Sequence, residues 1–312
     1  MSRLNIIFMG TSDFAVPCLK ALSQSDHGVS LVVTQPDRPK GRGRKIAEPP
    51  VKQAAKDLGY TVVQPESVNT EKFFNQLSEL RPDLFVVAAF GHILPKRLLE
   101  LPRMGAVNLH ASLLPKYRGP SPIHWAIING ETETGVTGML MDAGLDTGEI
   151  LLSKGTPIYA DDTAGTLHDR LAMIATDVLI QTLEGFCEGT IRPIPQNHAM
   201  ASYAPLLKKT DGHLDWTRTA EYLERFIRGM NPWPGAYTYW GDKRLNIYMA
   251  EIRPGDREHQ PGTVLSAFDN ELRVATGKDA VSILEIQAES GRRMNISKFL
   301  KGANLPPGTV LK

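Results

Sequence analysis

The sequence predicts an α/β domain with a mainly parallel sheet, followed by a smaller β-barrel domain. In the first half of the chain, short apolar runs alternate with stretches of helical spacing, which is the pattern of βαβ units. Near residue 189 this alternation stops, and short strands separated by turn residues follow, as in small barrels. A chain of 312 residues is also longer than one ordinary domain, so two domains are expected.

In the first domain, apolar strands and helical stretches follow one another along the chain. A parallel sheet of this kind is covered on both faces, and its ligands bind at the carboxyl ends of the strands. Gly10 and Gly91 fall at two such ends, and Thr163 precedes the longest helix as a suitable N-cap. The predicted strands are 4–9, 29–34, 62–63, 84–90, 107–111, 134–142 and 149–158, and the predicted helices include 51–58, 71–80 and 163–186.

The predicted domain boundaries follow the change of pattern. They give a first domain over 1–189, a proline-containing linker with little periodicity over 190–208, and a second domain over 209–312. In the second domain we expect a helix at 220–230 and strands at 245–252, 262–265, 272–275 and 281–286.

The composition indicates a soluble cytoplasmic protein. The net charge is +1, with 22% charged and 42% hydrophobic residues, and no apolar run approaches the roughly 20 residues of a membrane span. The N-terminal apolar run reaches a turn too soon for a signal peptide. Cys18 and Cys187 lie far apart and are expected to be buried, reduced thiols. The near-neutral charge excludes a generic polyanion binder, so any contact with nucleic acid must come from local basic patches.

One constellation of polar residues has the chemistry of acyl transfer. Asn108 and His110 are two residues apart at the end of an apolar run, so on a strand their side chains share one face. Asp146 follows in a Gly-Leu-Asp-Thr-Gly turn. An amide can stabilise an oxyanion, and an imidazole paired with a carboxylate can move protons. A strand histidine or a turn aspartate often has only a structural role, and the combination is what favours catalysis.

Two other kinds of site are less well supported. The turn at Gly10 invites a dinucleotide-binding interpretation, but it lacks the GxGxxG spacing, and no acid ends the second strand at the expected distance. No His, Cys and Asp cluster has the spacing of metal ligands either. We therefore expect neither a dinucleotide nor a metal.

The segment between Gln35 and Pro50 is rich in basic residues, glycine and proline. Such a run is often a solvated flexible loop, but it also suits an arm that grips phosphates and wedges an RNA end. The basic residues are Arg38, Lys40, Arg42, Arg44 and Lys45.

The stretches NLHASLLPKYRG and NGETETGVTGMLMDAGLDTGEIL resemble the signature of the folate-dependent formyltransferases. Other segments are similar in the same order, and they cover nearly the whole chain. The closest resemblance is to the members that formylate methionyl-tRNA. These segments are IIFMGTSDFAVPCL, TQPDRPKGRGRK, VVAAFGHILP, TAGTLHDRLA and NPWPGAY.

The resemblance implies the following expectations. Residues 1–189 would form a Rossmann-like formyltransferase catalytic domain that binds no dinucleotide, and residues 209–312 an OB-fold-like barrel that contacts tRNA. The formyl donor would be 10-formyltetrahydrofolate and the acceptor the α-amine of initiator methionyl-tRNA, for translation initiation. A monomer without membrane contact is expected.

The resemblance also implies roles for particular residues. Asn108, His110 and Asp146 would be catalytic, and Arg42 would wedge the RNA. The folate would contact backbone groups at Phe90 and Gly91 and the run formed by Ser112, Leu113, Leu114 and Pro115. His92 is expected to be an exposed loop residue, and Lys116, Tyr117 and Arg118 to face the folate tail, the RNA or water. The candidate RNA contacts of the second domain are Lys208, Lys209, Arg225, Arg228, Lys243, Arg244, Arg292, Arg293, Lys298 and Lys301.

Three alternatives remain. A formyltransferase that acts on a small amine, such as an amino-sugar nucleotide or glycinamide ribonucleotide, would share the catalytic residues. It would have no need for the basic segment or the second domain. A hydrolase that releases formate from the same folate would not need the basic segment or the second domain either. A non-catalytic RNA- or folate-binding module would not need Asn108, His110 and Asp146.

Overall fold

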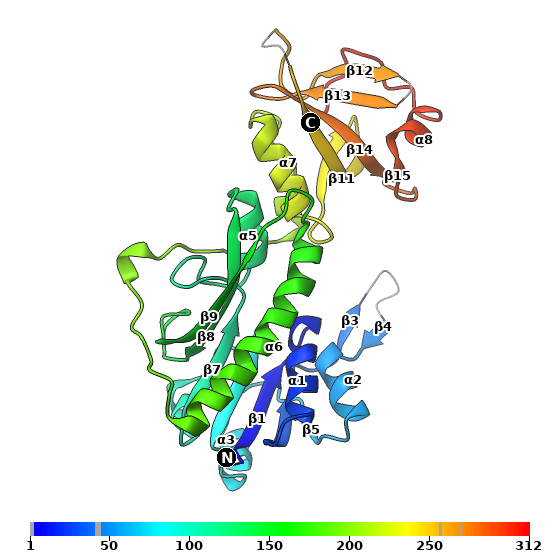
Figure 1. Ribbon diagram of the computed structural model, residues 1–312. Coiled ribbons are helices and arrows are strands. Elements are labelled where there is room, and N and C mark those ends of the chain that lie inside the picture. Colours follow the sequence, from blue (N-terminus) through cyan, green and yellow to red (C-terminus); the bar gives the residue numbers. More distant parts are fainter. Residues whose placement is uncertain (1–2, 41–44, 256–257, 269) are drawn as a thin grey trace. The chain divides into compact units, whose positions relative to one another are not determined.

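The computed structural model describes residues 3–40, 45–255, 258–268 and 270–312, and the chain forms two compact units (Figure 1). Each unit collects segments that are distant in the sequence. The predicted division into 1–189, 190–208 and 209–312 stays a prediction. The first unit contains Met1–Pro122, Glu133–Thr156 and His168–Ala204, and the second contains Ile123–Thr132, Pro157–Leu167 and Pro205–Lys312.

The first unit is built on a seven-stranded sheet with the order β5-β2-β1-β6-β7-β8-β9. The strands from β5 to β7 pair in parallel, and β8 pairs antiparallel to β7. The predicted mainly parallel sheet is therefore confirmed. The strands are β1 (Asn5–Gly10), β2 (Gly28–Val33), β5 (Val62–Val63), β6 (Leu84–Ala88), β7 (Ala106–His110), β8 (Glu133–Leu140) and β9 (Ile150–Pro157).

Helices cover both faces of this sheet, as its apolar strands require. Successive residues of β1 point to opposite faces, and Ile6, Ile7, Phe8 and Met9 are all fully buried. Ile7 and Met9 pack with α3 (Glu71–Glu79) in one apolar cluster. On the other face, α6 (Ala164–Glu188) lies against β8, and its Thr176 hydroxyl is 3.9 Å from the Cys18 thiol on α1 (Val16–Ser23).

The remaining helices are short, whereas α6 spans 25 residues. The Thr163 hydroxyl accepts a hydrogen bond from the N–H of Thr166, and the Thr166 hydroxyl accepts one from the N–H of Thr163. The predicted N-cap of the long helix is therefore confirmed. The other helices of the chain outside the C-terminal sheet are η1 (Asp13–Ala15), α2 (Pro50–Asp57), α4 (Lys96–Leu99), α5 (Pro122–Ile128), η2 (His198–Met200) and η3 (Lys209–Gly212).

Two features of the first unit differ from the expected elements. β6 ends at Ala88 rather than at residue 90, because Ala89 and Gly91 have φ values of +42° and +78° and so leave the extended conformation. The basic segment, which the sequence presents as a loop, contains the paired strands β3 (Arg38–Lys40) and β4 (Lys45–Ala47).

The second unit contains an antiparallel sheet with the order β10-β11-β14-β13-β12. The four expected strands are present, whereas β10 was not expected, although the run AYTYW has the β-branched and aromatic residues of a strand. The elements are α7 (Ala220–Gly229), β10 (Ala236–Trp240), β11 (Lys243–Arg253), β12 (Val264–Phe268), β13 (Glu271–Ala275), β14 (Ala280–Ala288), β15 (Met294–Asn295) and α8 (Ile296–Leu300).

The C-terminal tail joins the two edges of this sheet. On one side the N–H of Val264 donates to the Thr309 carbonyl and the N–H of Leu311 to the Gly262 carbonyl, both at 2.8 Å. On the other side Lys312 and Tyr239 exchange two backbone hydrogen bonds of 2.7 and 2.9 Å. Because neither edge strand is left unpaired there, the sheet closes as a small barrel does.

Neither Cys18 nor Cys187 forms a disulfide, and the two thiols differ in exposure. Burial raises the pKa of Cys18 to about 12, so its thiol is unreactive near neutral pH. Cys187 is only half-buried, which corrects the expectation that both thiols are buried. None of the helices that the structure describes is both long enough and apolar enough to span a membrane.

We expect Leu311→Ala to lower the free energy of unfolding of the second unit by about 2 to 5 kcal/mol. The side chain of Leu311 is 2% exposed and belongs to the apolar core of this unit, so truncation leaves a cavity at the closure. Urea unfolding followed by tryptophan fluorescence measures this change, because all four tryptophans lie in the second unit.

Val310→Ala is the matched control, because Val310 is the neighbouring residue and is 36% exposed. Its cost is expected to stay below about 1 kcal/mol. Equal costs for the two variants would show that the tail does not contribute through burial of Leu311.

Candidate active site

The centre of the candidate site is the carboxyl end of β7. Asn108 pairs with Val87 of β6 on one side and with Met139 of β8 on the other, and His110 pairs with Thr137. The side chains of Asn108 and His110 therefore share one face of the sheet, with about 6.6 Å between their Cα positions along the strand.

His110 is buried, and its ring contacts two oxygen atoms. Nε2 lies 2.9 Å from the backbone carbonyl of Tyr117, and Nδ1 lies 3.6 Å from Oδ2 of Asp146. A carbonyl oxygen only accepts hydrogen bonds, so Nε2 carries a proton. Nδ1 is consequently the ring nitrogen that faces the Asp146 carboxylate.

Asp146 reaches His110 through a loop that folds back along the sheet. The loop begins where the N–H of Met141 donates to the carbonyl of Ala106 at the start of β7, whereas His110 ends the same strand. Residues 142–146 therefore run along the face of the sheet for most of the length of β7. Gly148 allows the close return, because a Cβ there would overlap the carbonyl oxygen of Leu140.

Asp146 has an unusual backbone conformation, with φ of +52°. This left-handed region costs a non-glycine residue about 1 kcal/mol, so other contacts must hold the loop. The N–H of Gly119 donates to Oδ2 of Asp146 at 2.8 Å, and the side-chain amide of Gln196 donates to the Asp146 carbonyl at 2.9 Å. The other carboxylate oxygen, Oδ1, accepts no hydrogen bond from the residues that the structure describes.

The Asn108 amide is available to a ligand. Among residues 3–40, 45–255, 258–268 and 270–312, no group makes a hydrogen bond to this side chain, which is half-buried. The site thus combines a free amide donor with an imidazole–carboxylate pair on one strand face. This set can stabilise a developing oxyanion and move protons. The described residues contain no group of three His, Cys, Asp or Glu side chains that could hold a metal ion.

The segment after β6 presents backbone polar groups. The carbonyl of Phe90 already accepts hydrogen bonds from the Thr11 hydroxyl at 2.8 Å and the Gln35 amide at 3.0 Å. By contrast, residues 91–94 make no backbone hydrogen bond to another described residue. Gly91 has a φ of +78°, which favours glycine, and a Cβ there would displace the Gln35 amide. The predicted folate contact at Phe90 and Gly91 thus has open N–H and C=O groups beside it, and the Phe90 carbonyl itself has little capacity left.

His92 belongs to the same segment and is not the exposed histidine that the sequence suggests. It is half-buried, and its ring centroid lies 5.2 Å from that of Phe90. Burial lowers the pKa of His92, and the positive charge of Arg38 lowers it further. Its Nε2 is buried without a partner among the described residues.

The run from Ser112 to Pro115 forms a turn that is held by hydrogen bonds of the Ser112 and Thr137 hydroxyls. Ser112 is fully buried and donates to the carbonyl of Lys116 at 2.7 Å. The Thr137 hydroxyl donates to the Ser112 carbonyl and accepts from the N–H of Leu114. Leu113 and Pro115 are half-buried and Leu114 is buried. The structure therefore assigns Ser112 to shaping the turn, and contact of this run with a folate stays a prediction.

Arg118 is a residue whose place the sequence does not indicate. Arg118 is 2% exposed, and its guanidinium donates to the side-chain oxygen of Gln196. The expected alternative in which Arg118 faces water is therefore wrong. Tyr117 is also buried, whereas Lys116 is exposed. Gln196 was not predicted either, because it lies in the segment that resembles a linker.

The basic segment is anchored at its base. Asp37 accepts hydrogen bonds from the Lys52 ammonium at 2.7 Å and the Gln64 amide at 2.7 Å, and these two bonds hold the pKa of Asp37 below its usual value. Arg38 is exposed and forms no salt bridge with the residues that the structure describes. The backbones of Lys40 and Lys45 pair between β3 and β4, and Arg42 and Arg44 lie outside the described residues.

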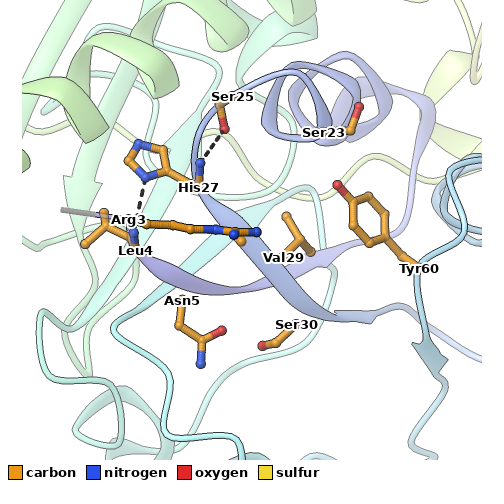
Figure 2. A pocket seen from close by; sticks show the side chains of 10 residues that line it. Arg3, Leu4, Asn5, Ser23, Ser25, His27, Val29, Ser30 and Tyr60 are labelled. Carbon is orange, nitrogen blue, oxygen red and sulfur yellow. Dashed lines mark hydrogen bonds between the residues drawn. The ribbon is translucent and has the colours of Figure 1, made fainter. Parts of the chain in front are cut away.

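A separate cavity of about 540 Å³ lies far from this chemistry (Figure 2). It is lined by Asn5 and Gly28, which begin β1 and β2, and by Arg3, His27 and Tyr60. It therefore opens at the amino ends of the parallel strands, opposite the edge at which ligands bind in such sheets. We assign it no part in the active site.

Two family profiles match the chain. The profile described as formyl transferase matches residues 3–183, and the one described as formyl transferase, C-terminal domain, matches residues 206–304. Together they cover most of the chain and include every candidate catalytic residue.

Relatives and solved structures agree with the profiles. The chain is 51% identical to a methionyl-tRNA formyltransferase of Desulfotalea psychrophila, over 99% of this chain and 96% of the relative. It is 50% identical to one of Caldanaerobacter subterraneus subsp. tengcongensis, over 99% and 100%. A structure of HypX from Aquifex aeolicus in complex with tetrahydrofolic acid has a TM-score of 0.64 at 18% identity, over 98% of this chain and 49% of that one. The chain therefore belongs to the formyl transferase family.

Proposed function

We propose that this enzyme transfers the formyl group of 10-formyltetrahydrofolate to the α-amine of initiator methionyl-tRNA, for translation initiation. The observation that carries the chemistry is the free Asn108 amide on the same strand face as the His110–Asp146 pair. The acceptor is inferred from relatives that match this chain over its whole length at about half identity and are named methionyl-tRNA formyltransferases.

Each of the three side chains has a separate task. As the amine nitrogen bonds to the formyl carbon, Asn108 donates its amide N–H to the oxygen that becomes negative. Asp146 takes the proton that the amine loses, directly or through Nδ1 of His110, and that proton returns to N10 as the bond between carbon and N10 breaks. An α-amine has a pKa of about 8, so this nucleophile needs little activation at neutral pH. The positioning of the two substrates supplies the remaining rate enhancement.

The open backbone groups of residues 91–94 suit the edge of the folate heterocycle. A pterin ring carries donors and acceptors at its edge, and a backbone segment with unpaired N–H and C=O groups can pair with both. This segment follows β6 at the point where the strand order reverses between β1 and β6, which is where such sheets bind ligands. The half-buried Leu113 and Pro115 supply apolar contact.

Two basic surfaces suit an RNA acceptor. In the first unit, Arg38 is exposed at the start of β3, which pairs with β4. In the second unit, Arg244 lies 3.7 Å from the ring centroid of Tyr237 and Lys243 lies 5.5 Å from that of Trp240. Cations beside aromatic rings can contact both phosphates and bases. Arg228 and Arg293 are held by Glu224 and Glu285 instead, so they are weaker candidates.

We expect formyl transfer from 10-formyltetrahydrofolate to charged initiator methionyl-tRNA and little transfer to charged elongator methionyl-tRNA. Formylated product and free formate are measured together, so that transfer and hydrolysis are separated. Transfer to neither tRNA would contradict the proposal. Product with an amino sugar or glycinamide ribonucleotide would then support a small-amine enzyme, and formate alone would support a hydrolase.

We expect Asn108→Ala to lower kcat by about 10² to 10³, because one oxyanion donor is lost. His110→Ala and Asp146→Ala should lower it by about 10² to 10⁴, because proton transfer is lost. The affinity for methionyl-tRNA, measured by filter binding, should change little. The matched control is Asn75→Ala, which removes an exposed amide on α3. Turnover like that of the unmodified enzyme in any of the three variants would remove that residue from the mechanism.

We expect Arg42→Ala to lower kcat/KM for initiator methionyl-tRNA by about tenfold or to weaken discrimination against the elongator tRNA, because a phosphate or wedge contact is lost. The dissociation constant of the folate should not change. Lys72→Ala, which removes an exposed cation of α3, is the control for a general loss of charge. Normal rate and normal selectivity in Arg42→Ala would rule out the wedge.

A further inference from the structure

The segment 194–204, here called the strap, belongs to the first unit and makes backbone hydrogen bonds to other parts of it near both of its ends. At its start, Ile194 and Ile150 exchange two backbone hydrogen bonds of 2.8 Å. Towards its end, the N–H of Arg118 donates to the Ser202 carbonyl at 2.8 Å, and the N–H of Ala204 donates to the Arg118 carbonyl at 2.7 Å. A segment of low periodicity thus runs beside the loop that carries Asp146.

Gln196 is the point at which the strap touches that loop. Its side chain is 6% exposed, and its amide nitrogen donates to the carbonyls of Asp146 at 2.9 Å and Gly148 at 2.7 Å. Its amide oxygen accepts from Nε and Nη2 of Arg118 at 3.1 and 2.7 Å. The amide nitrogen of Gln196 thus donates both of its hydrogen bonds to the loop, and its amide oxygen accepts from the Arg118 guanidinium.

Arg118 is buried without an acid beside it. Besides Gln196, its guanidinium contacts Nδ1 of His198 at 3.1 Å, and no carboxylate pairs with it among the residues that the structure describes. Burying a charge is costly unless it is paired and hydrogen-bonded. An apolar side chain would fill this space without the cost of burying a charge. The hydrogen bonds of Arg118 therefore point to its role.

The task is visible in what the two residues hold. Gly119 directly follows Arg118, and its N–H fixes Oδ2 of Asp146, while Gln196 fixes the Asp146 carbonyl. The backbone and the carboxylate of Asp146 are thereby held from two sides in a left-handed conformation. These hydrogen bonds therefore hold the Asp146 carboxylate 3.6 Å from Nδ1 of His110.

We propose that Gln196 and Arg118 are positioning residues of the formyl transfer reaction, which hold Asp146 against His110. This inference rests on the proposed function, because it assigns Asp146 a role in proton transfer. It adds that the proton relay depends on the strap, a segment of the chain about 50 residues beyond Asp146.

The test is a double-mutant cycle on Gln196 and Asp146. Gln196→Glu keeps the size of the side chain and the acceptor for Arg118, but a carboxylate cannot donate to the two loop carbonyls. We expect this variant to lower kcat by about 10 to 100-fold, since misplacement of a reacting group is enough for such a loss. The KM for methionyl-tRNA should change less than about threefold, because no RNA contact is altered.

In the Asp146→Asn background, Gln196→Glu should lower kcat by less than about threefold, because Gln196 acts through Asp146. A strap that merely stabilises the fold would give additive losses, and that result would overturn the proposal. Asn197→Ala is the matched control, because Asn197 is the exposed neighbour on the strap and caps only the turn of η2. A loss of kcat in this control equal to that of Gln196→Glu would also overturn it.

Hydrogen exchange gives a readout that does not depend on activity. The amide of Gly119 is protected by its bond to Asp146, so Gln196→Glu should raise its exchange rate by about tenfold or more, and Asn197→Ala should not. Gln196→Met, which keeps the volume and removes the hydrogen bonds, replaces the glutamate variant if that one fails to fold. Unchanged exchange at Gly119 in a folded variant would overturn the proposal. A chain that transfers no formyl group but shows the exchange change would refute only the proposed function.

Discussion

The register of β7 between β6 and β8 decides which side chains the active site can contain. Asn108 and His110 face one side of the sheet, whereas Val107 and Leu109 are buried on the side covered by α6. A slip of one residue would exchange the two sets. It would bury an amide and an imidazole among apolar side chains, so the apolar residues of β7 fix the catalytic ones in place. Catalysis and core packing are therefore set by the same strand pairing.

Much of this arrangement could be predicted because it depends on local patterns. The apolar runs of β1 and β6 follow from burial on both faces of a parallel sheet. The shared face of Asn108 and His110 follows from the alternation of a strand, and Thr163 follows from capping. Arg118 and Gln196 could not be predicted, because they meet across 78 residues and each lies beside glycine or proline in segments that look exposed. β10 was missed because Pro232, Pro234 and Gly235 lie just before it and are typical of a turn. The hairpin β3–β4 was missed because glycines and charges hide its pairing.

The catalytic groups are held almost entirely by uncharged partners. His110 contacts a carbonyl of Tyr117, Asp146 contacts the N–H of Gly119, and the loop behind it is held by an amide. Such groups orient a side chain without adding a competing charge to the site. The one buried cation nearby, among the residues described, is Arg118, and the Gln196 amide stands between it and the Asp146 loop. Arg118 therefore does not pair with the Asp146 carboxylate, which faces Nδ1 of His110 instead.

The division between chemistry and acceptor choice follows from the same facts. Any formyl acceptor with an amine could use Asn108, His110 and Asp146, so these residues cannot distinguish a tRNA from a small amine. The net charge of +1 also gives the whole protein no general attraction for RNA. Recognition must come from cations that no acid neutralises. Among the described residues Arg38, Lys243 and Arg244 form no salt bridge, whereas Arg228 and Arg293 do. Selectivity for tRNA is therefore a property of surfaces that the reaction itself does not need.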